Sequence, residues 1–189
     1  MRAFARTNLP HLYYNKSCII APESITARKG HSILMETNDE TANCFICQKH
    51  RGELPIPGGL IYEDKLLAVC HLQHQGGNPK GTYLGYLMIE NKRHIPGLAE
   101  LTDEEAQALG LMAARLARAL KESEGAEHIY QFVIGDGVPH LHIHIAARYP
   151  GAPHQYWGTH VDEWPEAPHG GLPEVEALCA RLRTYLQEQ

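Results

Sequence analysis

The segment "HLHIHIAA", residues 140–147, alternates histidine with apolar residues and predicts a β-strand. Successive side chains of a strand point to opposite faces, so His140, His142 and His144 should share one face. The apolar residues between them should face a core; they are Leu141, Ile143 and Ile145. A solvated, histidine-rich face is the alternative, but such faces usually carry Lys, Glu, Thr or Ser. The shared face is therefore our first candidate for a functional site.

One helix is predicted with clear signals at both ends. Thr102 and Glu105 have the spacing of an N-terminal capping box, and Gly125 is a typical residue after a helix end. Between them an apolar stripe recurs at helical spacing. Its members are Leu109, Met112, Ala113, Leu116, Ala117 and Leu120.

Further strands and a second helix complete an α+β pattern. We expect strands over residues 66–72, 82–90 and 127–135, the last forming a hairpin with the histidine-rich strand. Residues 148–173 read as a long loop rich in Pro, Gly and aromatic residues. A final helix is expected over residues 173–187; its inward residues are Leu178, Leu182 and Tyr185.

The 189 residues suit one domain with a core of its own, together with an extension. We expect an N-terminal extension of unknown structure over residues 1–40 and the main domain over 41–150. Residues 151–189 should form a loop and a C-terminal helix that pack on the same domain.

The charge and hydropathy patterns exclude several classes of partner. The net charge is −5 and the sequence contains no basic run, so binding to a nucleic-acid backbone is not predicted. The N-terminal residues lack the apolar segment of a secretory signal, and no apolar stretch approaches the length of a membrane span. We therefore expect a cytoplasmic protein that does not bind membranes.

Cys44 and Cys47 stand at C-x-x-C spacing, which suits two thiolates on one tetrahedral Zn²⁺. The sequence has no second C-x-x-C, so the two further ligands would be histidines, and His94 and His140 are the best placed. A pair of reduced structural thiols is one alternative. A redox pair is another, although no βαβ pattern surrounds it.

Together these motifs resemble the histidine triad (HIT) family of nucleotidyl hydrolases and transferases, of the zinc-bearing type. The family signature is His-φ-His-φ-His-φ-φ, where φ is apolar, and the upstream hallmarks follow in order. In this chain they are "CFIC", "YED" at 62–64, "GYLMIENKRH", the helix start "LTDEE" and "VPHLHIH". The third of these, "GYLMIENKRH", resembles the family pattern G-H-x-L-V-x-P-K-x-H. The resemblance covers about residues 44–150.

The resemblance implies a HIT-like catalytic domain with an antiparallel sheet of about five strands, continued across a two-fold homodimer. It implies attack by His142 on the α-phosphorus of a nucleotide or dinucleoside polyphosphate, with His144 binding the phosphate oxygens. It also implies one structural zinc per chain. The implied zinc ligands are Cys44, Cys47, His94 and His140.

Four further residues are candidates for phosphate or nucleotide binding. Gly135 and Gly137 could bring bare backbone close to a phosphate, and Trp157 could stack on a base. Asp136 stands between the glycines where the family often has an uncharged Gln, and it would repel phosphate unless turned away or protonated. Tyr86 also departs from the family, in which many members carry His at this position.

Two other functions stay open on the sequence. A HIT fold can hold nucleotides without turnover, because a fold does not prove an activity. Alternatively, the three triad histidines could bind a catalytic metal in a metal-dependent hydrolase, although the chain is too short for a (β/α)8 barrel.

Overall fold

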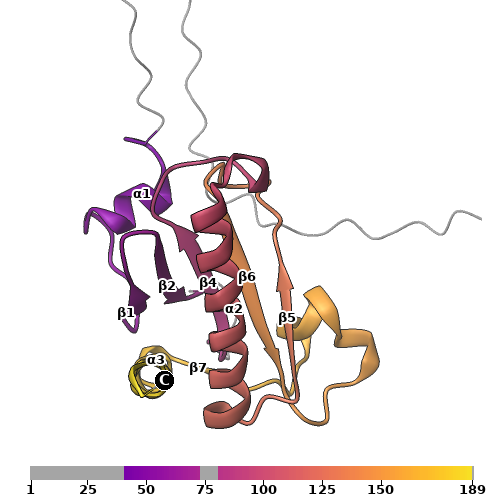
Figure 1. Ribbon diagram of the computed structural model, residues 1–189. Helices are drawn as coiled ribbons and strands as arrows, with labels where there is room; N and C mark the ends of the chain where they lie inside the picture. Colours follow the sequence, from indigo (N-terminus) through magenta and orange to yellow (C-terminus); the bar gives the residue numbers. More distant parts are fainter. Residues whose placement is uncertain (1–40, 73–80, 189) are drawn as a thin grey trace, which may run out of the picture. The chain divides into compact units, whose positions relative to one another are not determined.

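The computed structural model describes residues 41–72 and 81–188, and Asp39–Gln189 form one compact unit (Figure 1). The prediction of an N-terminal extension over 1–40 lies outside the described residues. No helix in the described ranges has both the length and the apolar character needed to cross a membrane.

The described residues form the predicted antiparallel sheet of five strands, in the order β1-β2-β4-β6-β5. This confirms the predicted α+β class. The central β4 and β6 pair in antiparallel register, with Glu90 opposite His142 and Met88 opposite His144. The strands are β1 (Leu60–Glu63), β2 (Leu67–His71), β4 (Tyr86–Asn91), β5 (His128–Phe132) and β6 (His142–Arg148).

Two strand predictions need correction. The strand expected over 82–90 is divided into β3 (Thr82–Tyr83) and β4, because the chain turns at Gly85. Gly85 has φ +85°, and an added Cβ would lie 2.6 Å from the Tyr149 hydroxyl, so only glycine fits this turn. β3 pairs instead with β7 (His169–Gly170), inside the region expected to be loop.

The predicted long helix is α2 (Asp103–Glu124), and its capping box is confirmed. The Thr102 hydroxyl accepts from the Glu105 backbone N–H, and the Glu105 carboxylate accepts from the Thr102 backbone N–H. Gly125 ends the helix in the left-handed conformation, with φ 71°. The other helical segments are α1 (Phe45–His50), α3 (Leu172–Gln187), η1 (Leu98–Glu100), η2 (His154–Tyr156) and η3 (Gly158–Glu163).

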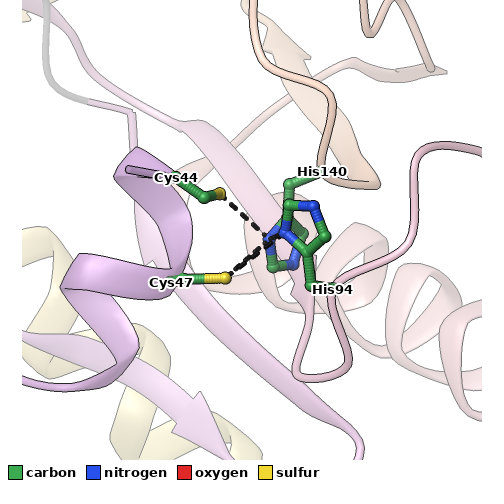
Figure 2. Close-up of side chains that lie close together, drawn as sticks. All are labelled: Cys44, Cys47, His94 and His140. Carbon is green, nitrogen blue, oxygen red and sulfur yellow. Dashed lines mark hydrogen bonds between the residues drawn. The ribbon is translucent and has the colours of Figure 1, made fainter. Parts of the chain in front are cut away.

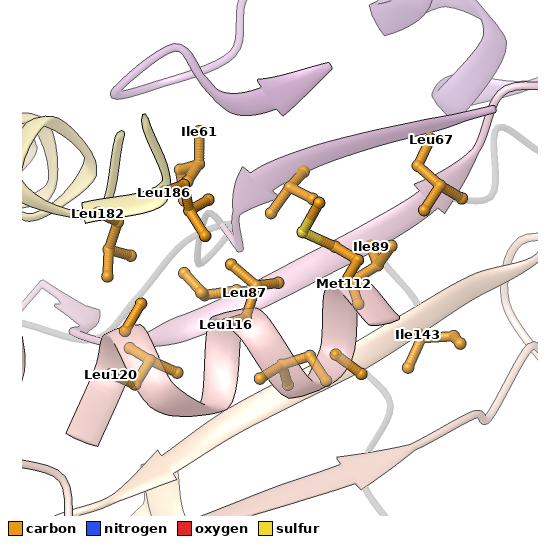
Figure 3. Packing of buried hydrophobic residues seen from close by; sticks show 14 of the residues in the cluster. Ile61, Leu67, Leu87, Ile89, Met112, Leu116, Leu120, Ile143, Leu182 and Leu186 are labelled. Atoms are coloured by element: carbon orange, nitrogen blue, oxygen red, sulfur yellow. The ribbon is translucent and has the colours of Figure 1, made fainter. Parts of the chain in front are cut away.

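The main core lies between one face of the sheet and the helices α2 and α3 (Figures 1 and 3). Leu116 and Leu120 of α2 are completely buried in it, close to Leu182 of α3. The predicted stripe is wrong at Ala117, which is only half-buried; Ala119 is buried instead. Tyr185 packs against this core as predicted but stays half-buried, and its hydroxyl donates to the exposed carboxylate of Glu122.

β6 presents its two faces as predicted, but it starts two residues late. Leu141, Ile143 and Ile145 all enter the main core. The strand begins at His142, whereas His140 lies in the bend before it. His142 and His144 therefore occupy the face opposite α2, on which the neighbouring strand β4 places Tyr86 and Met88.

His71 links the end of β2 to the turn at Gly85. Its Nδ1 donates to the Leu72 carbonyl oxygen at 2.8 Å, and its Nε2 accepts from the Gly85 backbone N–H at 3.1 Å. Burial lowers the pKa of His71 from 6.5 to about 4. The folded state therefore keeps this ring neutral over a range of pH in which the unfolded chain binds a proton.

We predict that stability falls as pH drops from about 6.5 towards about 4, with His71 contributing about 2 kcal/mol of the loss between pH 7 and pH 5. Denaturant unfolding of wild type and His71→Gln at both pH values measures the effect. The variant should be less sensitive to pH, whereas His128→Gln, on an exposed part of β5, should behave like wild type. An equal pH dependence in His71→Gln and wild type would contradict the assignment.

Candidate functional site

Two cysteines and two histidines converge beside α1 (Figure 2). Cys44 and Cys47 point from the first turn of α1, and His94 and His140 face them from two loops. The four ligand atoms lie within 4.8 Å of one another. The sequence-predicted metal ligands are thus brought together as a group that could hold a metal ion.

The distances fit a tetrahedral ion. The Nδ1 of His140 lies 3.3 Å from Cys44 Sγ, 3.4 Å from Cys47 Sγ and 3.2 Å from His94 Nδ1. Metal–ligand bonds of ~2.0 to 2.3 Å around Zn²⁺ give tetrahedron edges of about 3.3 to 3.8 Å. Two sulfurs and two imidazoles are a donor set that zinc prefers.

The hydrogen bonding of His140 prepares it as a ligand. Its Nε2 lies 2.7 Å from the Asn91 carbonyl oxygen, and because a carbonyl only accepts, Nε2 must carry the proton. Burial lowers the pKa of His140 to about 4, so the ring is neutral and its lone pair sits on Nδ1. The lone pair faces the two sulfurs, and a cation at that point would satisfy all three groups.

The ring of His142 is also oriented by a hydrogen bond to a backbone carbonyl oxygen, but through Nδ1, whereas His140 uses Nε2. Its Nδ1 lies 2.6 Å from the His140 carbonyl oxygen, so this nitrogen carries the proton and donates. A neutral ring then has its lone pair on Nε2, with which no described residue forms a hydrogen bond. This arrangement gives a buried imidazole with one nucleophilic nitrogen.

His144 lies beside His142, with ring centroids 5.1 Å apart. Burial, and then the neighbouring His142, lower the pKa of His144 to about 4. His142 and His144 belong to no metal-ligand group of the described residues, which include only the four-residue group above. This gives no support to the alternative in which all three triad histidines bind a catalytic metal.

A buried charged cluster next to His142 was missed in the sequence. Glu90, opposite His142 on β4, accepts from Lys49 and lies 3.1 Å from His50 Nε2. Burial alone would raise the pKa of Glu90, but the hydrogen bond from His50 and the charge of Lys49 hold it below its usual value. The available signal was a lone acid inside the apolar strand "YLMIEN".

The remaining predicted site residues lie on the connection from β5 to β6 and beside the end of β6. Gly135, with φ 76°, Asp136 and Gly137 form the connection from β5 to β6, in which Asp136 and Gly137 are exposed. The Trp157 ring is 41% exposed and has the Arg148 guanidinium over it at 3.8 Å. Arg148 is the last residue of β6, four residues beyond His144, so Trp157 lies beside the end of this strand.

Fold and side chains together define a class: an α+β protein with a Cys2His2 group at one end of its sheet and two oriented imidazoles on the sheet face. A model of the HIT domain matches residues 54–151. The chain therefore belongs to the HIT family.

Individual relatives agree with this assignment. Protein hit of Bacillus subtilis (strain 168) is 29% identical over 133 residues, 65% of this chain and 83% of that protein. Bis(5'-adenosyl)-triphosphatase of Dictyostelium discoideum is 32% identical over 95 residues, 47% of this chain and 63% of that enzyme. The crystal structure of a zinc-bound histidine triad family protein from Mycobacterium smegmatis superposes on this chain with a TM-score of 0.57 at 21% identity. The superposition covers 78% of this chain and 96% of that one, so the two proteins share the fold.

Proposed function

We propose that this protein is a nucleotidyl hydrolase or transferase that acts on the α-phosphate of a nucleotide or dinucleoside polyphosphate through a covalent intermediate on His142. The observation that carries the proposal is the 2.6 Å hydrogen bond from His142 Nδ1 to the His140 carbonyl oxygen. It leaves the Nε2 lone pair as the group that can attack phosphorus.

The reaction has two steps that share this nitrogen. In the first, Nε2 attacks the α-phosphorus, an N–P bond forms, and the P–O bond to the leaving group breaks with its electron pair on that oxygen. In the second, water or another acceptor hydroxyl attacks phosphorus, loses its proton, and the N–P bond breaks to return the imidazole. Hydrogen-bond donors around the phosphate stabilise the charge that develops.

Two features support the substrate class. His144 and the backbone of Gly135 and Gly137 are the donors that we assign to the phosphate oxygens, with the exposed Asp136 turned towards solvent. The Dictyostelium relative is named for the hydrolysis of a bis-adenosyl triphosphate, which is such a substrate. The fragment in common is less than two thirds of that enzyme, so the substrate is our proposal for this chain.

A panel of nucleotides, nucleoside phosphoramidates and dinucleoside polyphosphates tests the function, with binding followed by thermal shift and turnover by product analysis. We expect at least one dinucleoside polyphosphate or phosphoramidate to be both bound and turned over. Binding without turnover of any compound would instead favour a non-catalytic nucleotide-binding HIT protein. Activity restored by added metal after chelation, with His142→Ala fully active, would favour a metal-dependent hydrolase.

We further propose that the Cys2His2 group holds one structural Zn²⁺ per chain. The ion would fix α1 to the bend at His140, two residues before the nucleophile, and so hold the start of β6. None of the four cysteines in the described part of the chain forms a disulfide, and thiolate ligands persist in the reducing cytoplasm, in which we place the protein.

We predict a homodimer, from the family resemblance and from β5, which is an edge strand of the sheet that the described residues form. Light scattering at micromolar concentration should give twice the mass of one chain. A single-chain mass at that concentration would rule out the dimer.

A further inference from the structure

The ring of His144 is held by aromatic side chains on both neighbouring strands. Phe132, opposite His144 on β5, stacks on it with an interplanar angle of 15° and a centroid distance of 5.2 Å. Tyr86 on β4 meets it edge-on at 85°, with centroids 5.8 Å apart. The plane of the imidazole is therefore fixed before any ligand binds.

The two nitrogens of this ring have different surroundings. Nδ1 lies 3.2 Å from the Tyr86 hydroxyl. Nε2 is buried and has no hydrogen-bond partner among the described residues. An unpaired buried polar atom is costly, so this nitrogen is positioned to bind a polar atom of a ligand.

The position of one proton decides what that ligand atom can be. The pKa of about 4 means that His144 is neutral at pH 7 and has a single N–H. If the proton is on Nδ1, Nε2 presents a lone pair and repels a phosphate oxygen, which only accepts. If it is on Nε2, the ring donates to that oxygen.

We propose that Tyr86 is a positioning residue that donates its O–H to Nδ1 of His144 and so places the ring's only proton on Nε2, directed at a phosphate oxygen. The phenol O–H can donate to Nδ1 only when that nitrogen is unprotonated, and a neutral imidazole then carries its single proton on Nε2. The proposal rests on the proposed function for the identity of the ligand as a phosphate.

The tautomer can be measured without a substrate. The ¹⁵N chemical shifts of histidine-labelled, metal-loaded protein distinguish protonated from unprotonated ring nitrogens, and His144→Gln identifies the signals of His144. In wild type we expect a protonated Nε2 and an unprotonated Nδ1. Tyr86→Phe keeps the ring but removes the donor, and should shift proton population to Nδ1.

Tyr62→Phe is the matched control, because it removes a tyrosine hydroxyl bonded to Asp64, away from the triad. Its His144 signals should equal those of wild type. A wild-type proton on Nδ1, or the same tautomer in Tyr86→Phe as in wild type, would overturn the proposal whether or not the protein proves to be an enzyme.

Kinetics with diadenosine triphosphate give a second readout. Tyr86→Phe should lower kcat about three- to tenfold, the value of one hydrogen bond, with KM little changed and the melting temperature close to wild type. Tyr86→His, which restores an N–H donor, should recover part of the loss. Equal kcat in wild type and Tyr86→Phe would contradict the role of Tyr86. The absence of turnover by wild type on every nucleotide would instead contradict the proposed function, and the tautomer measurement would then decide the role of Tyr86.

Discussion

Replacement of His142 with alanine should lower turnover of a dinucleoside polyphosphate at least about a thousandfold, because the covalent route then has no nucleophile. Charge stabilisation and binding are retained, so nucleotide affinity should stay within a few-fold of wild type. Steady-state kinetics and binding measured on the same preparation test both expectations.

His128→Ala is the control, since it removes an exposed histidine from β5 without touching the triad. It should keep wild-type turnover. The metal content and melting temperature of His142→Ala should also stay near wild type, because the ring of His142 is not a ligand in the Cys2His2 group. Substantial activity in His142→Ala would contradict the assignment of the nucleophile.

Replacement of Cys44 with serine should remove the bound zinc and lower the melting temperature by roughly 10 °C. A structural zinc site contributes several kcal/mol to folding, and each kcal/mol corresponds to a few degrees in a chain of this size. The Cys44 sulfur lies 3.3 Å from the His140 nitrogen, so loss of the ion also frees the bend that precedes His142. Elemental analysis and thermal unfolding are the two measurements.

Cys179→Ser separates metal loss from general destabilisation. Cys179 is completely buried in the main core, against Gly58 and far along the sequence from the Cys2His2 group. This variant should also melt at a lower temperature but keep its zinc. Wild-type protein purified without chelator and containing no zinc would contradict the metal assignment.

The parts of the fold that could be predicted from sequence are those set by local periodicity and capping. Alternation assigned Ile143 and Ile145 to the core, and the Thr102–Glu105 capping box placed the start of α2 correctly. The division of the predicted strand over 82–90 could not be foreseen, because it depends on the approach of Tyr149 to Gly85 from a distant part of the chain.

The candidate site divides in the same way. The C-x-x-C pair and the alternating histidines are local patterns, and they identified Cys44, Cys47 and the shared histidine face as candidates. The full ligand set with His94 and the role of His142 as nucleophile came from the family resemblance. Contacts that join distant residues were missed: Glu90 meets Lys49 across 41 positions, and Tyr86 meets His144 across 58. No local pattern encodes which residues the sheet register will place side by side.

The most direct test of the account is to trap the intermediate on His142. Protein mixed with a dinucleoside polyphosphate, quenched with acid-free denaturant and digested at once, should yield one peptide with the mass of a covalent nucleotidyl group, and fragmentation should place that group on His142. His142→Ala treated identically should yield none. A nucleotidyl adduct on any other residue, or the same adduct yield from His142→Ala, would contradict the mechanism.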